Sequence, residues 1–356
     1  MNFSNVLIYW YLQNKRDLPW RNTTNPYHIW MSEIILQQTR VDQGLTYYLK
    51  FVESFPTVFD LANAQEEEIL KLWQGLGYYS RARNLHTSAK YIISEFEGNF
   101  PSTYSEIIKL KGVGDYTASA IASICFNEVT AVVDGNVYRV LSRYFGISTP
   151  INSTKGIKAF KVLAQELINP KKPATHNQAI MEFGARMCKP QNPDCTICPL
   201  NESCVALEKN TVKLLPVKEK KIKVRKRYFN YLVVMTDDGK TVVNKRITKG
   251  IWQNMYEFPL IESDSLIEIN ELVEHPKFQQ LVNKSEVKVS LYNAVPKVHK
   301  LSHQHLHTRF WIVKTELPKT KKISWNSIEE YPVPILIHNF IEELKRTEIF
   351  STFDKI

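Results

Sequence analysis

Two carboxylates stand in surroundings that would change their chemistry. Glu33 is the only charged residue in the run IWMSEIIL (residues 29–36), and Asp134 lies between Val-Val and Gly-Asn at the start of a new helical pattern. A helix whose other residues are apolar partly removes a glutamate from water, which raises its pKa and leaves a proton to donate near neutral pH. Each residue also has a plain structural role open to it. Glu33 can face solvent beside Ser32, and Asp134 can cap the helix that follows.

Two such carboxylates suit the cleavage of a glycosidic bond. One protonates the leaving group while the other faces the oxocarbenium-like carbon. The same division of labour applies when the leaving group is a nucleobase. Because a base inside a duplex cannot be reached, such an enzyme must also hold the DNA backbone and extrude the nucleotide.

A glycine pair and the net charge both indicate a polyanionic partner. Gly112 and Gly114 flank Val113 directly before an apolar helical run. A helix that opens on glycine leaves backbone N–H groups available to an anion such as a DNA phosphate. The formal net charge of +10 and the pI of about 9.1 favour the same kind of partner.

Four of the five cysteines form the pattern C-x6-C-x2-C-x5-C between residues 188 and 204. Their thiolates can converge on one metal centre, and four-cysteine sites hold either zinc or an iron–sulfur cluster. Cys125 lies far away in an apolar run and is expected in the core. The clustered spacing is unlike a disulfide framework, so a reducing compartment is expected.

Residues 1–208 carry an almost continuous helical pattern. Asn25 followed by Pro26 predicts a capped helix start, and Thr103 with Glu106 predicts a T-x-x-E capping box. Further helices are expected at the amphipathic N-terminus, at residues 66–73 and 81–96, and from Val137.

The composition changes after the cysteines. Residues 217–227 hold seven Lys or Arg and one acid, as in a solvated linker or a nucleic-acid contact. The β-rich runs YLVVMT and TVVNKRI then flank residues 237–240 (DDGK), which is typical of a β-hairpin. The strand-like run RFWIVKTEL and a closing helix near residues 335–344 complete a small α+β domain.

The chain is therefore expected to contain two domains. These are a helical domain at 1–208 and an α+β domain at 228–356, which a basic linker at 209–227 joins. No apolar run approaches the length of a membrane span, and the N-terminus lacks the features of a signal peptide. We expect no membrane partner, and a cytoplasmic, nucleoid-associated location if the source is bacterial.

A series of motifs occurs in the order seen in the A/G-specific adenine DNA glycosylases, which the chain resembles over residues 3–208 and more weakly beyond 228. The motifs are LPWR, PYHIWMSEIILQQTRV, LWQGLGYYSRARNLH, LKGVGDYTASAIAS, VVDGNVYRVLSR, NQAIMEFGA and the four-cysteine array. The resemblance implies the helix-hairpin-helix glycosylase fold. It also implies a [4Fe–4S] cluster rather than zinc on the cysteine ligands Cys188, Cys195, Cys198 and Cys204.

The resemblance implies a role for each matching residue. Glu33 matches the acid that protonates adenine N7 and later handles water, and Asp134 matches the aspartate that stabilises the sugar cation. Tyr116 and Asn136 match residues that support these two carboxylates. The residues that match DNA-binding or substrate-binding positions are Arg21 and Gln178 in the adenine pocket, Gln38 and Tyr78 in the base stack, Gly112 and Gly114 in the hairpin, and Ser302 and His303 beside the oxidised guanine. Plainer roles remain open to Tyr78, as a core residue, and to Gln38, on a helix surface.

Tyr116 separates this family from its sister family. Endonuclease III-like enzymes place a lysine at this position, and its amine attacks the sugar as a Schiff-base nucleophile. Tyrosine cannot form the imine, so the resemblance implies base excision without a strong lyase step. Two positions depart from the family pattern: Lys111 stands where proline is usual, and Leu301 stands where an aromatic residue is more frequent.

The C-terminal domain resembles a Nudix module that recognises 8-oxoguanine. After residues 250–259 no R-E-x-x-E-E arrangement follows, so nucleotide hydrolysis is not expected. Histidines at 299, 303, 305 and 307 make zinc binding sterically possible, although strand-edge or DNA-contact roles are simpler.

The sequence thus predicts a monofunctional, monomeric glycosylase that removes adenine paired with 8-oxoguanine or guanine in double-stranded DNA. Two alternatives remain open. One is a bifunctional endonuclease III-like glycosylase and lyase, and the other is a non-catalytic iron–sulfur protein that binds DNA.

Overall fold

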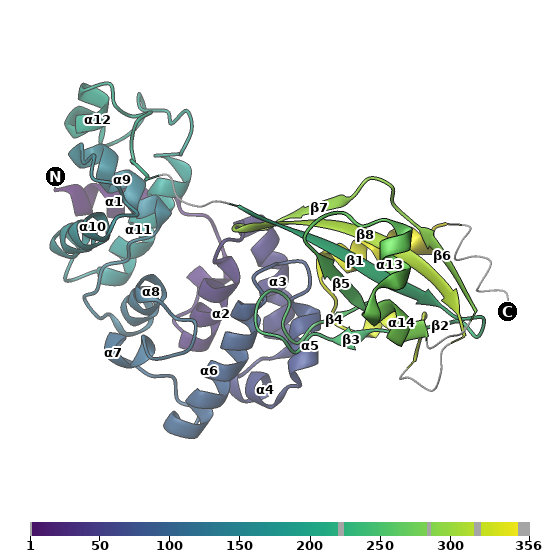
Figure 1. Cartoon of the computed structure of the whole chain (residues 1–356). Helices are drawn as coiled ribbons and strands as arrows, with labels where there is room; N and C mark the ends of the chain where they lie inside the picture. The colour runs from purple at the N-terminus through teal and green to yellow at the C-terminus, as the bar shows by residue number, and fades with distance from the viewer. Residues whose placement is uncertain (1, 220–223, 283–285, 317–321, 348–356) are drawn as a thin grey trace. The chain divides into compact units, whose positions relative to one another are not determined.

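The computed structural model describes residues 2–219, 224–282, 286–316 and 322–347 (Figure 1). The chain divides into two compact units, which comprise residues 1–63 with 84–220 and residues 64–83 with 221–356. The linker at 209–227 stays a prediction, because residues 220–223 of its basic run lie outside the described residues.

The first unit is built from helices. The helix starts expected at Pro26 and after Thr103 are confirmed: Asn25 Oδ1 accepts the N–H of Tyr27 at 3.0 Å, and both bonds of the capping box with Glu106 are present. The α-helices are α1 (Phe3–Asn14), α2 (Pro26–Leu36), α3 (Val41–Ser54), α4 (Val58–Asn63), α6 (Ser80–Phe96, which begins in the second unit), α7 (Tyr104–Ile107), α8 (Asp115–Phe126), α9 (Gly135–Phe145), α10 (Thr154–Leu167), α11 (Pro173–Arg186) and α12 (Val205–Glu208).

The turn between α7 and α8 requires glycine at one position. Gly112 has a φ of +82°, and a Cβ there would lie 2.8 Å from the Cβ of Asn84. Gly114 is extended and precedes α8, whose first N–H groups have no partner within the helix. The Ser88 hydroxyl donates to the Lys111 carbonyl at 3.1 Å, so the turn forms with lysine in place of proline.

Helix α11 is central to the first unit, since α1, α8 and α9 all pack against it. Trp10 of α1 meets Phe183 of α11 edge-on, with ring centroids 5.0 Å apart. A Cβ at Gly184 would lie 2.9 Å from the carbonyl oxygen of Asn136. Glycine at this position therefore lets α11 approach the start of α9, which places Asp134 beside α11.

The second unit contains α5 (Glu66–Leu72) and a sheet in the order β5–β1–β8–β6, with β7 also paired to β8. Strands β1 and β8 are parallel, and the other pairs in this sheet are antiparallel. The strands are β1 (Arg225–Met235), β2 (Lys240–Thr241), β3 (Asn244–Lys245), β4 (Tyr256–Glu257), β5 (Leu260–Ser263), β6 (Val287–Leu291), β7 (Lys297–Lys300), β8 (Gln304–Thr315) and β9 (Ile323–Ser324).

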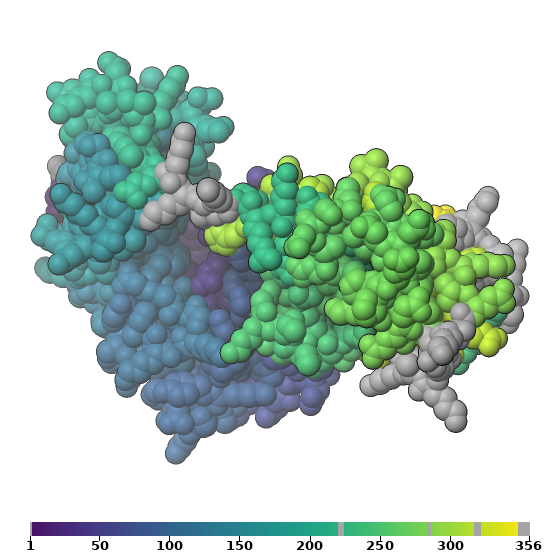
Figure 2. Space-filling model, viewed as in Figure 1, coloured from purple at the N-terminus to yellow at the C-terminus, as the bar shows by residue number. Residues whose placement is uncertain are grey.

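Helices cover both faces of this sheet. On one face, Leu232 and Trp311 share a buried cluster with Phe278 of α14 (Pro276–Val282), which follows α13 (Ile269–Glu274). Figure 2 shows the side chains of this green segment covering the strands behind it. On the other face, Phe310 stacks on Phe340 of α15 (Ile335–Lys345), with centroids 3.8 Å apart. The expected α+β domain with a closing helix is confirmed.

The β-hairpin expected around residues 237–240 is wrong in its pairing. The turn forms, and the Thr236 N–H donates to the Lys240 carbonyl at 3.2 Å. However, β2 pairs with β9 and β3 pairs with β4. Strand β2 lies beside β1, whose pairing with β5 covers only Tyr228–Tyr231, but the ladder that β2 forms is with β9.

Within the part of the chain that the structure describes, no helix is both long enough and apolar enough to cross a membrane.

Candidate active site

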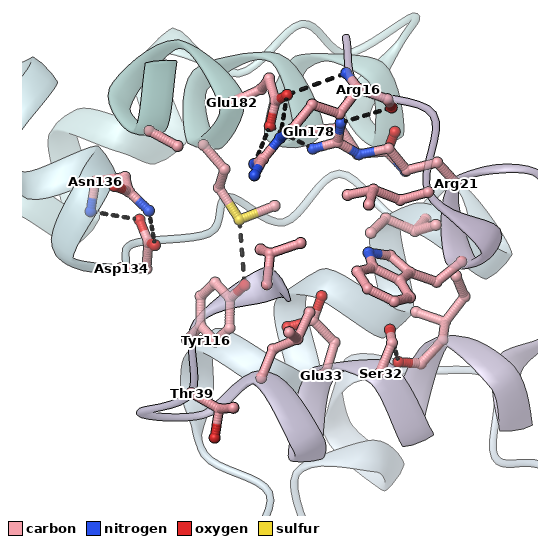
Figure 3. Close-up of a pocket in the computed structure, with 18 residues that line it drawn as sticks. Arg16, Arg21, Ser32, Glu33, Thr39, Tyr116, Asp134, Asn136, Gln178 and Glu182 are labelled. Carbon is pink, nitrogen blue, oxygen red and sulfur yellow. Dashed lines mark hydrogen bonds and ion pairs between the residues drawn. The ribbon is translucent and has the colours of Figure 1, made fainter. Parts of the chain in front are cut away.

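The first unit contains a cavity of about 270 Å³ (Figure 3). Its walls come from η1 (Pro19–Arg21), α2, α8, the start of α9 and α11. The site residues predicted from the sequence that line it are Arg21, Glu33, Tyr116, Asp134, Asn136 and Gln178. The fold therefore gathers side chains from distant parts of the chain around one small space.

Glu33 lies on α2 and is half-buried against the cavity. Burial raises the pKa of its carboxyl to about 7. Hydrogen bonding from Tyr116 lowers this pKa, the negative charge of Asp134 raises it, and the positive charge of Arg21 lowers it. With this pKa, a large fraction of the molecules keep the proton at neutral pH, which suits a general acid. A glutamate that simply faces open solvent would not show this shift.

Tyr116 projects from α8 into the same part of the cavity, and Figure 3 shows it beside Glu33. Its hydroxyl donates to Met181 Sδ at 3.2 Å. Burial, followed by the negative charges of Glu33 and Asp134, raises the pKa of this phenol well above its usual value. Tyr116 is therefore a neutral hydrogen-bond donor next to the candidate acid.

Asp134 caps α9 and lines the cavity at the same time. Its Oδ1 accepts the backbone N–H groups of Asn136 (2.9 Å) and Val137 (2.8 Å), and its Oδ2 accepts the Asn136 side-chain amide at 2.7 Å. Burial raises the pKa of Asp134, although the hydrogen bonds from Val137 and Asn136 oppose the rise. These bonds fix the direction in which the carboxyl faces the cavity.

Arg139 holds the Asn136 side chain in turn. Its Nη2 donates to Asn136 Oδ1 at 2.8 Å and to the Gly184 carbonyl at 2.5 Å, and its Nε donates to the Cys188 carbonyl at 2.7 Å. The buried guanidinium of Arg139 thus links the Asn136 amide to Cys188, the first residue of the four-cysteine pattern.

The cavity also contains a buried ion pair that sequence reasoning missed. Glu182 of α11 is fully buried and accepts bonds from Arg16 Nη2 (2.7 Å) and Arg21 Nη2 (2.6 Å). Burial alone would raise the pKa of Glu182, but the hydrogen bonds from Arg16 and Arg21 outweigh it and lower the pKa to about 2. The sequence did contain a signal for this residue: Glu182 follows Gln178 by four positions in the motif NQAIMEFGA, so both lie on one face of the helix.

Gln178 lines the cavity one turn before Glu182 on α11. Its side-chain oxygen accepts the Tyr11 hydroxyl at 2.5 Å. With the oxygen occupied, the amide N–H groups of Gln178 are the ones left to meet a ligand.

Gln38 and Tyr78 both adopt left-handed backbone conformations, with φ of +56° and +48°. Such conformations are uncommon for residues that carry a side chain and often mark functional positions. Gln38 lies beyond the end of α2 and is exposed, rather than on the helix surface. Tyr78 is 50% exposed, so its interpretation as a core residue is wrong.

Ser302 and His303 are exposed in the loop between β7 and β8. Within the second unit, the Ser302 hydroxyl lies 2.5 Å from the Tyr78 hydroxyl. His303 precedes β8, so only His305 and His307 of the expected tract share a face of that strand. Among the residues that the structure describes, no three His, Cys, Asp or Glu side chains form a group that could hold a single metal ion.

The four cysteines of the cluster motif, Cys188, Cys195, Cys198 and Cys204, line one small cavity of about 30 Å³. Arg143 also lines it, and its Nη1 lies 3.4 Å from Cys188 Sγ, where it would stabilise a thiolate. A single zinc ion needs its thiolates within about 2.3 Å of one point. An iron–sulfur cluster holds its thiolates farther apart, because each binds a different iron. The four thiols line one common space, as the ligands of a single metal centre must.

Comparisons with known proteins agree with both units. Residues 31–166 match the HhH-GPD superfamily of base excision DNA repair proteins, and residues 230–343 match the NUDIX domain. The chain is 36% identical to an adenine DNA glycosylase of Buchnera aphidicola subsp. Schizaphis graminum, over 86% of this chain and 85% of that protein. It is 33% identical to an adenine DNA glycosylase of Buchnera aphidicola subsp. Baizongia pistaciae, over 97% of each.

A solved structure, that of a thermostable thymine-DNA glycosylase, matches the fold with a TM-score of 0.55 and 33% identity. The match covers 58% of this chain and 95% of that one. The helical unit with its two cavity carboxylates, the NUDIX-like region and the relatives matched over most of their length agree, and the chain belongs to the adenine DNA glycosylase family.

Proposed function

We propose that this protein removes adenine paired with 8-oxoguanine, or with guanine, from double-stranded DNA by hydrolysing the N-glycosidic bond. The observation that carries the proposal is that Glu33, with a pKa of about 7, and Asp134 line one cavity. The names of the full-length relatives support adenine as the leaving base.

In this mechanism Glu33 enters the reaction protonated. It donates its proton to N7 of the extruded adenine, which makes the base a better leaving group. Asp134, held in place by its cap bonds, faces the positive charge that develops on the sugar. The ionised Glu33 then accepts a proton from the water that attacks the sugar carbon.

Polar groups on the opposite wall would recognise the base. Arg21 and the Gln178 amide line the cavity, and the Gln178 oxygen is already occupied by Tyr11. The remaining N–H groups of Gln178 suit the ring-nitrogen acceptors of adenine. Arg16 and Glu182 hold Arg21 in place from behind.

Tyr116 makes the enzyme monofunctional. It occupies the position where a lysine amine would attack the sugar, and a phenol cannot form an imine. The excision product would therefore be an intact strand with an abasic site.

The duplex would be held by three surfaces. The Gly112 to Gly114 turn offers backbone N–H groups to a phosphate. Gln38 and Tyr78 would enter the base stack, and the loop with Ser302 and His303 would contact the oxidised guanine. We further propose that the protein acts as a monomer, in the cytoplasm close to the nucleoid if it is bacterial.

We propose that the four cysteines hold a [4Fe–4S] cluster. When bound, the cluster supplies a covalent cross-link between the loop at residues 188–204 and the end of α11. Two arginines hold the first ligand in place: Arg139 donates to the Cys188 carbonyl, and Arg143 donates to the Cys188 sulfur. A brown colour with broad visible absorbance would support the cluster, whereas a colourless protein with bound zinc would contradict it.

The test is incubation with duplexes that contain adenine opposite 8-oxoguanine, guanine, cytosine or thymine, followed by heating in alkali. Cleavage of the adenine strand opposite 8-oxoguanine, only after alkali, is the expected result. Cleavage without alkali and borohydride trapping would instead favour a bifunctional enzyme. Duplex binding without base release from any lesion would favour a non-catalytic protein.

A further inference from the structure

The Tyr116 hydroxyl has one proton and two neighbours that can accept it. Met181 Sδ lies 3.2 Å away and receives the hydrogen bond in this structure. The carboxyl of Glu33 is the second neighbour, and hydrogen bonding to Tyr116 favours its ionised form. A phenol cannot donate to both at once, so its partner depends on the state of Glu33.

The two protonation states of Glu33 need different arrangements. An ionised carboxylate is the stronger acceptor and receives the hydrogen bond of the Tyr116 hydroxyl. A protonated Glu33 is a weak acceptor, and the buried hydroxyl then needs another partner. Met181 supplies one, because its sulfur faces the same cavity from α11.

We propose that Met181 is a positioning residue that accepts the hydrogen bond of the Tyr116 hydroxyl while Glu33 is protonated and loses that bond to Glu33 when Glu33 is ionised. The proposal rests on the proposed function, in which Glu33 passes through both states during one reaction. The sulfur thus stabilises the protonated state, in which Glu33 is ready to act as an acid.

Other charged groups also act on Glu33, so the effect of Met181 must be separated from theirs. Asp134 at the start of α9 favours the protonated form, and Arg21 on η1 favours the ionised form. Cys125 on α8 is also close, since burial and then the charge of Glu33 raise the pKa of that thiol. Substitution of Met181 leaves all of these groups in place.

The experiment measures the titration of Glu33 in the DNA-free holoprotein by infrared spectroscopy with 13C-labelled glutamate. The Glu33 band is identified by its loss in Glu33→Gln. Met181→Leu keeps the volume and removes the acceptor, so the midpoint should fall by about half a pH unit. Met181→Gln restores an acceptor and should move the midpoint back up. Met31→Leu, the same change at a fully buried position of α2, is the matched control.

A second arm separates hydrogen bonding from packing. In a Tyr116→Phe background the hydroxyl that donates the hydrogen bond is absent, so Met181→Leu should no longer shift the midpoint of the Glu33 titration. An unchanged midpoint in Met181→Leu alone, or an equal shift in the Tyr116→Phe background, would overturn the proposal. The infrared result needs no turnover, so it stays separate from the excision assay. If the protein excises adenine, the alkaline limb of its pH profile should move with the same midpoint.

Discussion

Replacing Glu182 by glutamine should destabilise the helical unit in a pH-dependent way. The Glu182 carboxylate is fully buried and accepts the Arg16 backbone N–H (3.1 Å), Arg16 Nε (2.8 Å) and Nη2 (2.7 Å), and Arg21 Nη2 (2.6 Å). A glutamine side chain removes the negative charge and turns an N–H₂ group toward one of these donors. Both guanidinium groups then lose their counter-charge inside the protein.

The size of the effect follows from the pKa of Glu182. The fall from 4.5 to about 2 corresponds to about 3 kcal/mol of stabilisation of the ionised, folded state. Because the pKa of the folded state is the lower one, this stabilisation is complete above about pH 4.5 and is lost as the pH falls toward 2. For a unit of this size, 3 kcal/mol corresponds to a Tm lower by roughly 6–12 °C.

Thermal melts followed by circular dichroism between pH 7 and pH 3 provide the measurement. The difference in Tm between Glu182→Gln and the unsubstituted protein should be greatest near pH 7 and shrink below pH 4.5. Asp115→Asn is the matched control, since its ion pair with Lys161 is exposed and should change Tm little. Equal melting temperatures at pH 7, or a difference that stays constant down to pH 3, would refute the reasoning.

Four further outcomes are expected. Glu33→Gln should abolish adenine release while duplex binding, measured by gel shift, stays within about twofold; retained turnover would reject the acid role. The single-turnover rate of the unsubstituted protein should fall about tenfold per pH unit above the Glu33 pKa of about 7, as the proton is lost. Gly112→Ala should weaken duplex binding at least tenfold, because alanine is strained at φ +82° and meets Asn84; a fluorescence titration checks this. Cys198→Ser should lower the iron content and visible absorbance of the purified protein, and an unchanged spectrum would remove this residue from the ligand set.

Local sequence signals predicted the helical unit well. Local residues determine the caps at Asn25 and Thr103 and the turn at Gly112, so a short stretch of sequence is enough to predict each of them. Glu33 was identified for the same reason, because its apolar neighbours on α2 are visible in the chain. Cys125, expected in the core, is half-buried in α8.

Features that depend on pairing across the chain were harder to predict. The role of Glu182 depends on Arg16 and Arg21, which lie more than 160 positions away. The hairpin prediction was wrong in its pairing because the turn at Gly239 depends on adjacent residues, whereas the strands that pair with β2 and β3 lie elsewhere in the sequence. Met181 also had no distinguishing signal, since a methionine in an apolar helix usually indicates only packing.

The cap at the start of α9 narrows what can occupy position 134. Serine, threonine, asparagine and aspartate all begin helices well, so the folding of α9 alone would accept any of them. Only aspartate among them also places a negative charge against the cavity. Asp134→Asn keeps the two cap bonds to Oδ1 but loses the bond from the Asn136 amide, so it should lower the melting temperature only modestly while it removes excision. Retention of aspartate at this position in related chains would then indicate selection for chemistry rather than for folding.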